Sequence, residues 1–96
     1  MKRDAIILRE VDNVGTLLRD ATKGEKIRAG VGEGMVIVIA GDDMPFGHKF
    51  AVRDIARGED ILKYGEVIGR ATADIPAGAH AHVQNIESLR GRGDLA

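Results

Sequence analysis

Short apolar runs separated by glycine-rich turns make up most of this 96-residue sequence. Ala5–Leu8 is a run of four apolar residues and predicts a buried first strand. Met35–Ala40 is longer, and its unbroken apolar character is typical of a strand that is buried on both faces. The segment Ile27–Ala29 predicts a brief strand between these two.

The residues after the first run follow a helical period. Asp12 is a residue type that caps helix N-termini. Apolar residues then recur at the i, i+3, i+4, i+7 spacing of one helical face, at Val14, Leu17, Leu18 and Ala21. We therefore expect one short amphipathic helix near the N-terminus, packed against a sheet.

An aspartate and a glycine recur at one spacing in three places. Segments Asp20–Ile27, Asp54–Ile61 and Asp74–Ala81 each contain Asp, three residues, Gly, two residues and an apolar residue. Glycine adopts backbone conformations that other residues avoid, so these glycines predict sharp turns. Gly65 and Gly69 interrupt the stretch 61–72, which indicates a bent or bulged strand. The sequence thus favours a mostly β fold with tight reversals.

The composition limits the classes of protein that fit. The length indicates one domain over residues 1–96, and residues 88–96 have the composition of a flexible tail. The formal net charge of −1 argues against a nucleic-acid-binding protein, which usually carries surplus basic residues. The absence of cysteine excludes disulfides and thiolate chemistry. Because no long apolar run is present, we expect neither a signal peptide nor a membrane span, and a cytoplasmic location.

All three histidines lie between Gly47 and Asn85. His80 and His82 are two residues apart, so on an extended strand both imidazoles point to one face. Paired neutral imidazoles often bind a divalent metal, but an ordinary hydrogen-bonded histidine is the simpler interpretation of such a pair. His48 adds a third imidazole to the same stretch.

Other side chains near these histidines are candidates for chemistry. Glu66 and Asn85 offer oxygen ligands. Lys49, Lys63 and Tyr64 are useful acid–base groups only if burial or a neighbour moves their pKa towards neutral.

Two further patterns have simpler explanations. Asp42 and Asp43 lie in a turn-rich loop, where paired acids bind their own backbone or water more often than a cation. The glycines within residues 30–34 precede neither a helical pattern nor a Lys-Ser/Thr pair, so they predict a turn and not a phosphate-binding loop.

A set of motifs occurs in one order along nearly the whole chain. They are Asp12-Asn13-Val14, Gly47-His48-Lys49-Phe50-Ala51, Ile55 with Gly58-Glu59, Lys63-Tyr64-Gly65-Glu66-Val67-Ile68-Gly69-Arg70-Ala71-Thr72, Ile75 with Gly78, and His80-Ala81-His82-Val83-Gln84-Asn85. In this order they resemble the N-terminal SAF-type domain of the UxaA family of sugar-acid dehydratases, which includes altronate and galactarate dehydratases.

This resemblance implies a mostly β, SAF-type β-clip fold, to which the helical period adds one short N-terminal helix. It implies a part in removing water from aldonate or aldarate acids, with a divalent metal that is often Fe2+. A large dehydratase subunit is the implied partner, since the fused enzymes of the family continue beyond this domain. On matching positions we expect metal binding by His80 and His82, catalysis by His48, Lys49, Tyr64 and Glu66, and substrate binding by Arg70 and Asn85.

Three alternatives stay open at this point. The chain also resembles the small subunit of sulfolactate sulfo-lyases, whose reaction breaks a carbon–sulfur bond. SAF domains occur as well in sialic acid synthases and antifreeze proteins, which implies a non-catalytic module that binds a sugar or a partner chain. A structural domain that supports an oligomer is the third alternative.

Overall fold

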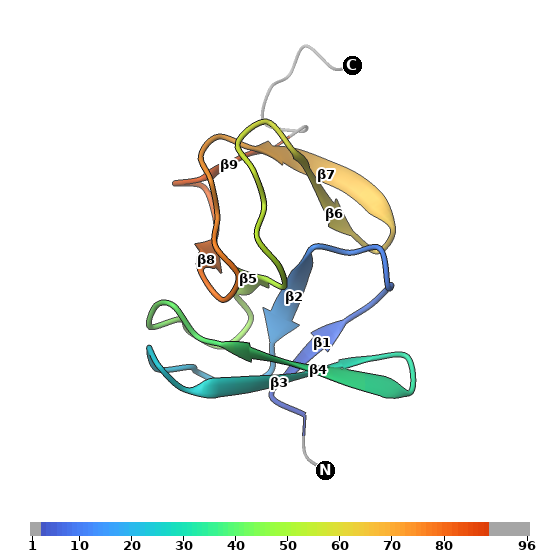
Figure 1. Ribbon diagram of the computed structural model, residues 1–96, viewed down its shortest axis with the longest axis vertical. Helices are drawn as coiled ribbons and strands as arrows, with labels where there is room; N and C mark the ends of the chain where they lie inside the picture. The colour runs from blue at the N-terminus through green and yellow to red at the C-terminus, as the bar shows by residue number, and fades with distance from the viewer. Residues whose placement is uncertain (1–2, 89–96) are drawn as a thin grey trace.

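The computed structural model describes residues 3–88, which form nine short strands and no helix. The strands are β1 (Ala5–Ile7), β2 (Val14–Leu17), β3 (Lys26–Val31), β4 (Gly34–Ile39), β5 (Lys49–Ala51), β6 (Asp60–Lys63), β7 (Glu66–Ala71), β8 (His80–Ala81) and β9 (Ile86–Ser88). Figure 1 shows the β3–β4 hairpin at one end of the molecule and β6, β7 and β9 at the other.

The strands form two sheets. The larger has the order β4-β3-β1-β2-β5-β8, and the smaller has the order β6-β7-β9. β1 lies parallel to β3, whereas the other strand pairs within residues 3–88 are antiparallel. This architecture confirms the prediction of a mostly β fold.

Four corners of the chain share one design, in which an aspartate precedes a glycine of positive φ by four positions. The glycines are Gly24 (φ 92°), Gly47 (φ 84°), Gly58 (φ 88°) and Gly78 (φ 88°). The repeat in the sequence predicts three of these corners, and the structure confirms them as turns. The fourth, Asp43–Gly47, has the same spacing with Phe50 at the apolar position, so it is a further copy of the repeat that the three predicted segments leave out.

The corners lie in two reciprocal pairs. Asp20 accepts a hydrogen bond from the backbone N–H of Phe46 at 2.8 Å, and Asp43 accepts one from the N–H of Lys23 at 2.9 Å. The corners that begin at Asp54 and Asp74 repeat this exchange. Carboxylates at such turns satisfy backbone donors that would otherwise lack a partner.

Two hydrophobic cores fill the molecule, and β5 contributes to both. Phe50 is fully buried in the core of the larger sheet, while its neighbour Ala51 is fully buried in the core below the smaller sheet. Successive residues of a strand point to opposite faces, so Phe50 packs into one core and Ala51 into the other. The two cores therefore anchor β5, which carries Lys49 and is directly preceded by His48.

The predicted N-terminal helix is wrong, because Val14–Leu17 forms the strand β2. β2 pairs with β1 on one side and with β5 on the other. A Cβ atom on Gly15 would lie 2.8 Å from the Phe50 ring, so this backbone packs directly on an aromatic side chain. Leu18, which completes the supposed helical face, is 45% exposed. Pairing on both sides and close packing override a weak helical period.

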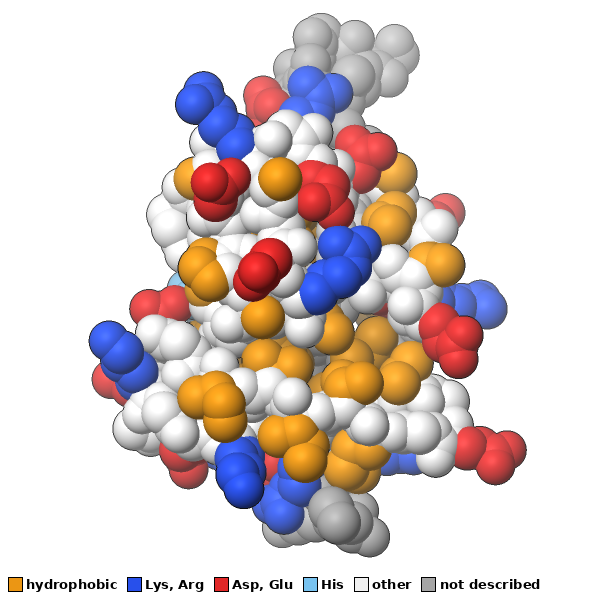
Figure 2. Space-filling model, viewed as in Figure 1, with side chains coloured by type: hydrophobic (Ala, Val, Ile, Leu, Met, Phe, Trp, Pro, Cys, Tyr) orange, Lys and Arg blue, Asp and Glu red, His pale blue; other side chains and the backbone are white. Residues whose placement is uncertain are grey.

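The prediction of a strand at Met35–Ala40 is confirmed by β4, but the expected burial on both faces is wrong. Among the strands of residues 3–88, β4 lies at the edge of its sheet with β3 as its single neighbour. Ile37 is 60% exposed and Ile39 52% exposed, whereas Val38 points into the core. Figure 2 shows apolar side chains gathered over this end of the molecule. A continuous apolar run cannot distinguish an edge strand from a central one.

The stretch 61–72 is bent, as its glycines predict. It forms the β6–β7 hairpin, which turns at Tyr64 and Gly65 and has a register shift between Ile61 and Leu62. Ser88, the first residue of the predicted tail, ends β9, and residues 89–96 lie outside the described part. Within residues 3–88, no helix has the length and apolar character needed to cross a membrane.

Candidate metal centre and adjoining pocket

Two neighbouring strands bring the three histidines together. His48 directly precedes β5, and His80 begins β8, which pairs with β5 in antiparallel register. Ala81 between the two other histidines is fully buried, so His80 and His82 both point away from the core. This arrangement confirms that the His-x-His segment directs two imidazoles to one place, and it adds His48.

The three imidazoles form a compact cluster. One ring nitrogen from each histidine can be chosen so that all three lie within 4.8 Å of one another. Nδ1 of His48 and Nε2 of His80 are 2.8 Å apart, which is a hydrogen bond between one protonated and one free nitrogen. The ring centroids are 5.0 to 5.3 Å apart.

Hydrogen bonds to the backbone fix the strand that carries His80 and His82. The side-chain oxygen of Asn85 accepts from the N–H of His82 at 2.9 Å, and its amide donates to the carbonyl of His80 at 2.8 Å. Asp42 accepts from the N–H of His80 at 2.9 Å. Asn85 and Asp42 therefore position the histidines through the main chain.

Burial and neighbouring charge favour the neutral form of His80. Partial burial lowers the pKa of His80, and the adjacent His48 and His82 lower it further, while Asp42 acts in the opposite direction. A neutral imidazole has a free lone pair, which is the form that a metal needs.

The donor set fits a divalent transition metal. Imidazole nitrogens are ligands for Zn, Fe, Ni and Cu ions. A tetrahedral ion with bonds of about 2.0–2.1 Å needs nitrogens about 3.3 Å apart. The chosen nitrogens lie within 4.8 Å of one another, so binding an ion requires the rings to move closer together. Three histidines leave further coordination positions for a substrate or for ligands from another polypeptide.

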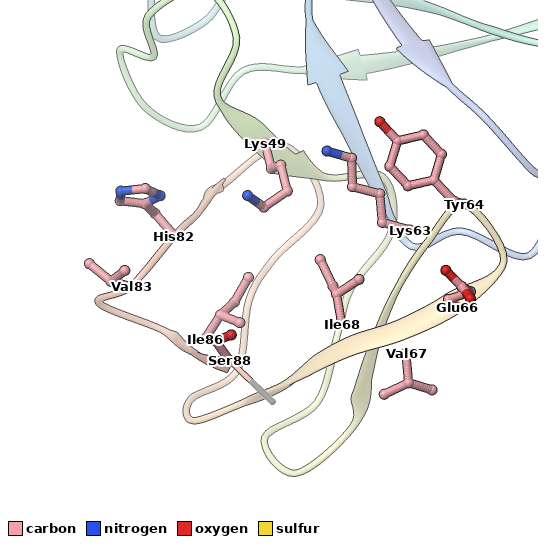
Figure 3. Close-up of a pocket in the computed structure, with 10 residues that line it drawn as sticks. All are labelled: Lys49, Lys63, Tyr64, Glu66, Val67, Ile68, His82, Val83, Ile86 and Ser88. Atoms are coloured by element: carbon pink, nitrogen blue, oxygen red, sulfur yellow. The ribbon is translucent and has the colours of Figure 1, made fainter. Parts of the chain in front are cut away.

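A pocket of about 600 Å³ adjoins the cluster and shares His82 with it. Figure 3 shows Lys49 and Lys63 between His82 on one side and Tyr64 on the other, with both amino groups directed towards the His82 side. Burial lowers the pKa of Lys49, and the charge of Lys63 lowers it further. The lining residues are Lys49, Lys63, Tyr64, Glu66, Val67, Ile68, His82, Val83, Ile86 and Ser88.

The turn that carries Tyr64 has an unusual backbone. Tyr64 has φ 59°, the only positive φ at a non-glycine residue within residues 3–88, and Gly65 follows with φ 73°. Asp12, which is buried, accepts hydrogen bonds from the N–H of Tyr64 at 3.0 Å and of Gly65 at 2.8 Å. A bulky residue with positive φ is strained, so this carboxylate holds the turn in place.

The structure brings most of the predicted site residues into one region. His48, His80 and His82 form the cluster, and Lys49, Tyr64 and Glu66 line the pocket. Arg70 is exposed on β7 and does not line this pocket. Both ends of the Asn85 amide bind backbone, which makes it a positioning residue.

Lys63, which the sequence offers as a candidate acid–base group, lines the pocket. Sequence reasoning assigned no role at the site to two other residues, Asp12 and Asn13. Asp12 holds the Tyr64 turn, whereas the sequence suggested a helix cap. The fully buried Asn13 joins the same hairpin to β2 by accepting from the N–H of Leu62 and donating to the carbonyl of Asp60. The pair Asp12-Asn13 belongs to the motifs of the resemblance, and this was the one available signal.

Comparisons with known proteins identify the family of this domain. Residues 3–89 match the family model described as the altronate/galactarate dehydratase SAF domain. Altronate dehydratase of Escherichia coli is 39% identical over 80 residues, which is 83% of this chain and 15% of that protein. Altronate dehydratase of Bacillus subtilis is 41% identical over 83 residues, which is 86% of this chain and 16% of that protein.

A third relative is a separate subunit. The alpha subunit of (2R)-sulfolactate sulfo-lyase from Chromohalobacter salexigens is 45% identical over 49 residues, which is 51% of this chain and 52% of that subunit. The chain spans about one sixth of the altronate dehydratases that it matches. It belongs to the family of altronate/galactarate dehydratase SAF domains and is a small domain related to sugar-acid dehydratases.

Proposed function

We propose that this chain is the SAF component of a sugar-acid dehydratase and supplies part of a metal and substrate site that another polypeptide or domain completes. The observation that carries the proposal is the convergence of His48, His80 and His82 beside a pocket lined by two lysines. The family supports the reaction class, since its relatives are dehydratases. The small share of those relatives that the chain spans supports the need for a second component.

Dehydration of a hydroxy acid breaks two bonds. A base accepts the proton on the carbon next to the carboxylate, and the electrons of that C–H bond form a double bond. The hydroxyl on the next carbon takes up a proton and leaves as water. The resulting enol converts to a keto acid by moving a proton from oxygen to carbon.

This chain offers groups for each of these demands. Glu66 and Tyr64 line the pocket and are the oxygen groups that can accept and return a proton there. Lys49 pairs with the carboxylate of the substrate, which holds the acidic C–H bond near those groups. A divalent metal such as Fe2+ bound by the three histidines would supply polarisation of the carboxylate and of the leaving hydroxyl.

Metal binding and activity are tested separately. The full chain is stripped of metal with a chelator and titrated with Co2+ and, without oxygen, with Fe2+, in a calorimeter. We expect one ion per chain, and loss of binding in the His80→Ala/His82→Ala double variant. Glu33→Ala, which changes an exposed residue of the β3–β4 turn, is the control. Unchanged affinity in the double variant would remove these histidines from the proposed site.

Activity is measured as keto acid formed from altronate. The chain alone is expected to produce none above background, whereas the chain combined with a large dehydratase subunit restores turnover. The His80→Ala/His82→Ala variant in the same mixture should lose most of it. If the chain alone dehydrates altronate at the rate of the mixture, the two-component proposal is wrong.

A sulfo-lyase component is the second candidate, because the similarity to a separate alpha subunit supports it. Both eliminations need a base near the carboxylate, and they differ in the leaving group. The same mixture is therefore supplied with sulfolactate, and released sulfite is measured. Sulfite without altronate turnover would favour this candidate over the dehydratase.

A further inference from the structure

Lys49 and Lys63 direct their ammonium groups into one pocket from different sheets. Lys49 belongs to β5 of the larger sheet and Lys63 to β6 of the smaller one. Figure 3 shows the amino group of Lys63 directed towards Lys49, whose own amino group is directed towards His82. Both lysines line the same pocket, so their charges act on each other there.

Neither lysine has an acidic partner among the ion pairs within residues 3–88. Those pairs all use arginines, and they join Arg19 and Arg28 to Asp4, Arg19 to Glu25, and Arg53 to Glu59. Two ammonium groups that line one pocket repel each other, and a bound anion relieves this repulsion. The pair therefore has the electrostatics of an anion site.

The turn that follows Lys63 has a strained backbone and is held by hydrogen bonds to Asp12. Lys63 directly precedes Tyr64, its Nζ lies 5.0 Å from the centre of the Tyr64 ring, and Tyr64 has positive φ. The buried carboxylate of Asp12 accepts both N–H groups of the turn. An Asn-Gly pair would form a hairpin turn of this kind without backbone strain. The strained Tyr64 turn and its support by Asp12 therefore indicate that the direction of the side chains at this turn matters.

The rest of the pocket indicates what the anion is attached to. Apolar side chains line one part of it, including Ile68 and Ile86. His82 lies at the other side, next to the three-histidine cluster. A carboxylate held by the lysines thus places the adjoining carbons of the same molecule near the imidazoles. A volume of about 600 Å³ is within the range of small-molecule sites.

We propose that Lys49 and Lys63 together bind the carboxylate of a polyhydroxy acid, and that Asp12 is the positioning residue that holds Lys63 in this arrangement. This inference rests on the proposed function for the identity of the acid. It adds Lys63 to Lys49 as a residue that binds the carboxylate. It also explains why the buried Asp12 holds the strained turn at Tyr64.

The test uses the full chain in a chelating buffer, so that its outcome does not depend on metal binding. Tyr64 is the single tyrosine and the chain has no tryptophan, so the tyrosine ring signals in an NMR spectrum report directly on this pocket. Gluconate is the probe, glucitol is the same polyol without a carboxylate, and inorganic phosphate is an anion without a carbon chain. We expect gluconate alone to shift the Tyr64 signals in a saturable way.

Variants then assign the residues. Lys63→Met should weaken gluconate binding about tenfold, because it removes a charge-assisted contact. Lys63→Arg should stay within about threefold of wild type, since it keeps the charge. Lys23→Met, which removes an exposed lysine outside the pocket, should have no effect. Equal gluconate affinity in Lys63→Met and wild type would overturn the proposal.

Asp12→Asn separates positioning from general stability. It should weaken gluconate binding about threefold and leave Co2+ binding by the histidines unchanged, since a charge-neutral amide holds the two N–H groups less firmly. If both ligands weaken together, Asp12 acts only on the whole fold and its positioning role is refuted. Binding of glucitol as tight as gluconate, or displacement of gluconate by phosphate at equal concentration, would refute a site for polyhydroxy acids. If the chain binds gluconate but no metal, the inference about the lysines holds and the proposal of a metal site fails.

Discussion

Asp54 and Asp74 hold each other's corners of the chain. Asp54 accepts a hydrogen bond from the N–H of Ala77 at 2.9 Å, and Asp74 accepts one from the N–H of Arg57 at 2.8 Å. Between them Ile55 and Ile75 form a two-way backbone bridge at 2.8 Å. The corner that ends in His80 thus depends on a corner 20 residues earlier in the sequence.

We expect Asp54→Ala to destabilise the fold by about 1 kcal/mol, since it leaves one backbone N–H without its carboxylate. Asp74→Ala should have a similar effect. Because each corner supports the other, the double variant should lose less than the sum of the two. Urea unfolding followed by circular dichroism measures all three. Glu33→Ala, in the exposed β3–β4 turn, is the control, and strict additivity would contradict the reciprocal support.

The sequence predicts the corners and the histidine pair because both depend on local spacing. Gly58 and Gly78 have positive φ, and the aspartate four positions earlier marks each turn. The i, i+2 spacing places His80 and His82 on one face. The turn spacing and the histidine spacing each lie within a short stretch of consecutive residues. They can therefore be recognised without information about the rest of the fold.

Pairing between distant segments explains what the sequence could not predict. Val14–Leu17 has a helical period but becomes β2, because β1 and β5 flank it and Phe50 packs on Gly15. His48 joins His80 only through the register of β5 and β8. Asp12 meets the Tyr64 turn over 52 positions. Such contacts follow from topology, which single-residue patterns do not specify.

Gly58 and Gly78 offer a matched comparison of backbone strain and steric conflict. Both have φ 88°, but a Cβ atom on Gly58 would meet nothing within 4 Å, whereas one on Gly78 would collide with the carbonyl oxygen of Ile39. Gly58→Ala should therefore destabilise the fold by about 1 kcal/mol through strain alone. Gly78→Ala should destabilise it by about 3 kcal/mol or more, since the backbone must move.

Thermal unfolding distinguishes these two variants. About 1 kcal/mol corresponds to a fall in Tm of about 4–8 °C for a domain of this size. Gly78→Ala should also broaden the NMR signals of His80, which lies two residues away. Equal losses in the two variants would show that the approach of Ile39 to the Gly78 corner contributes nothing.

Asp4 should make the stability of the fold depend on pH. Burial on its own would raise the pKa of Asp4, but hydrogen bonds from Arg19 and Arg28 outweigh it and hold the pKa well below its ordinary value of 3.8. A folded-state pKa below the unfolded one stabilises the fold fully above the unfolded value. This contribution is lost as the pH falls below about 4.

Asp4→Asn tests this dependence. At pH 7 the variant should be about 2 kcal/mol less stable than wild type, because two arginines lose a buried carboxylate. The difference should shrink when urea unfolding is repeated at pH 3. Glu33→Gln, an exposed acid at the β3–β4 turn, should show no comparable change. A gap between Asp4→Asn and wild type that stays constant from pH 7 to pH 3 would refute the assignment to Asp4.

Metal bound by the histidine cluster should stabilise the folded chain. An ion that binds only the folded state at 100 times its dissociation constant adds about 2.7 kcal/mol. We expect Co2+ to raise Tm by about 11–22 °C in wild type, and excess chelator to reverse the rise. His48→Ala should abolish most of it, although the sequence placed His48 among catalytic groups and not among metal ligands. Glu33→Ala, in the exposed β3–β4 turn, should keep the full rise. A normal rise in His48→Ala would mean that His80 and His82 bind the ion without His48, and that the 2.8 Å contact between His48 and His80 serves another purpose.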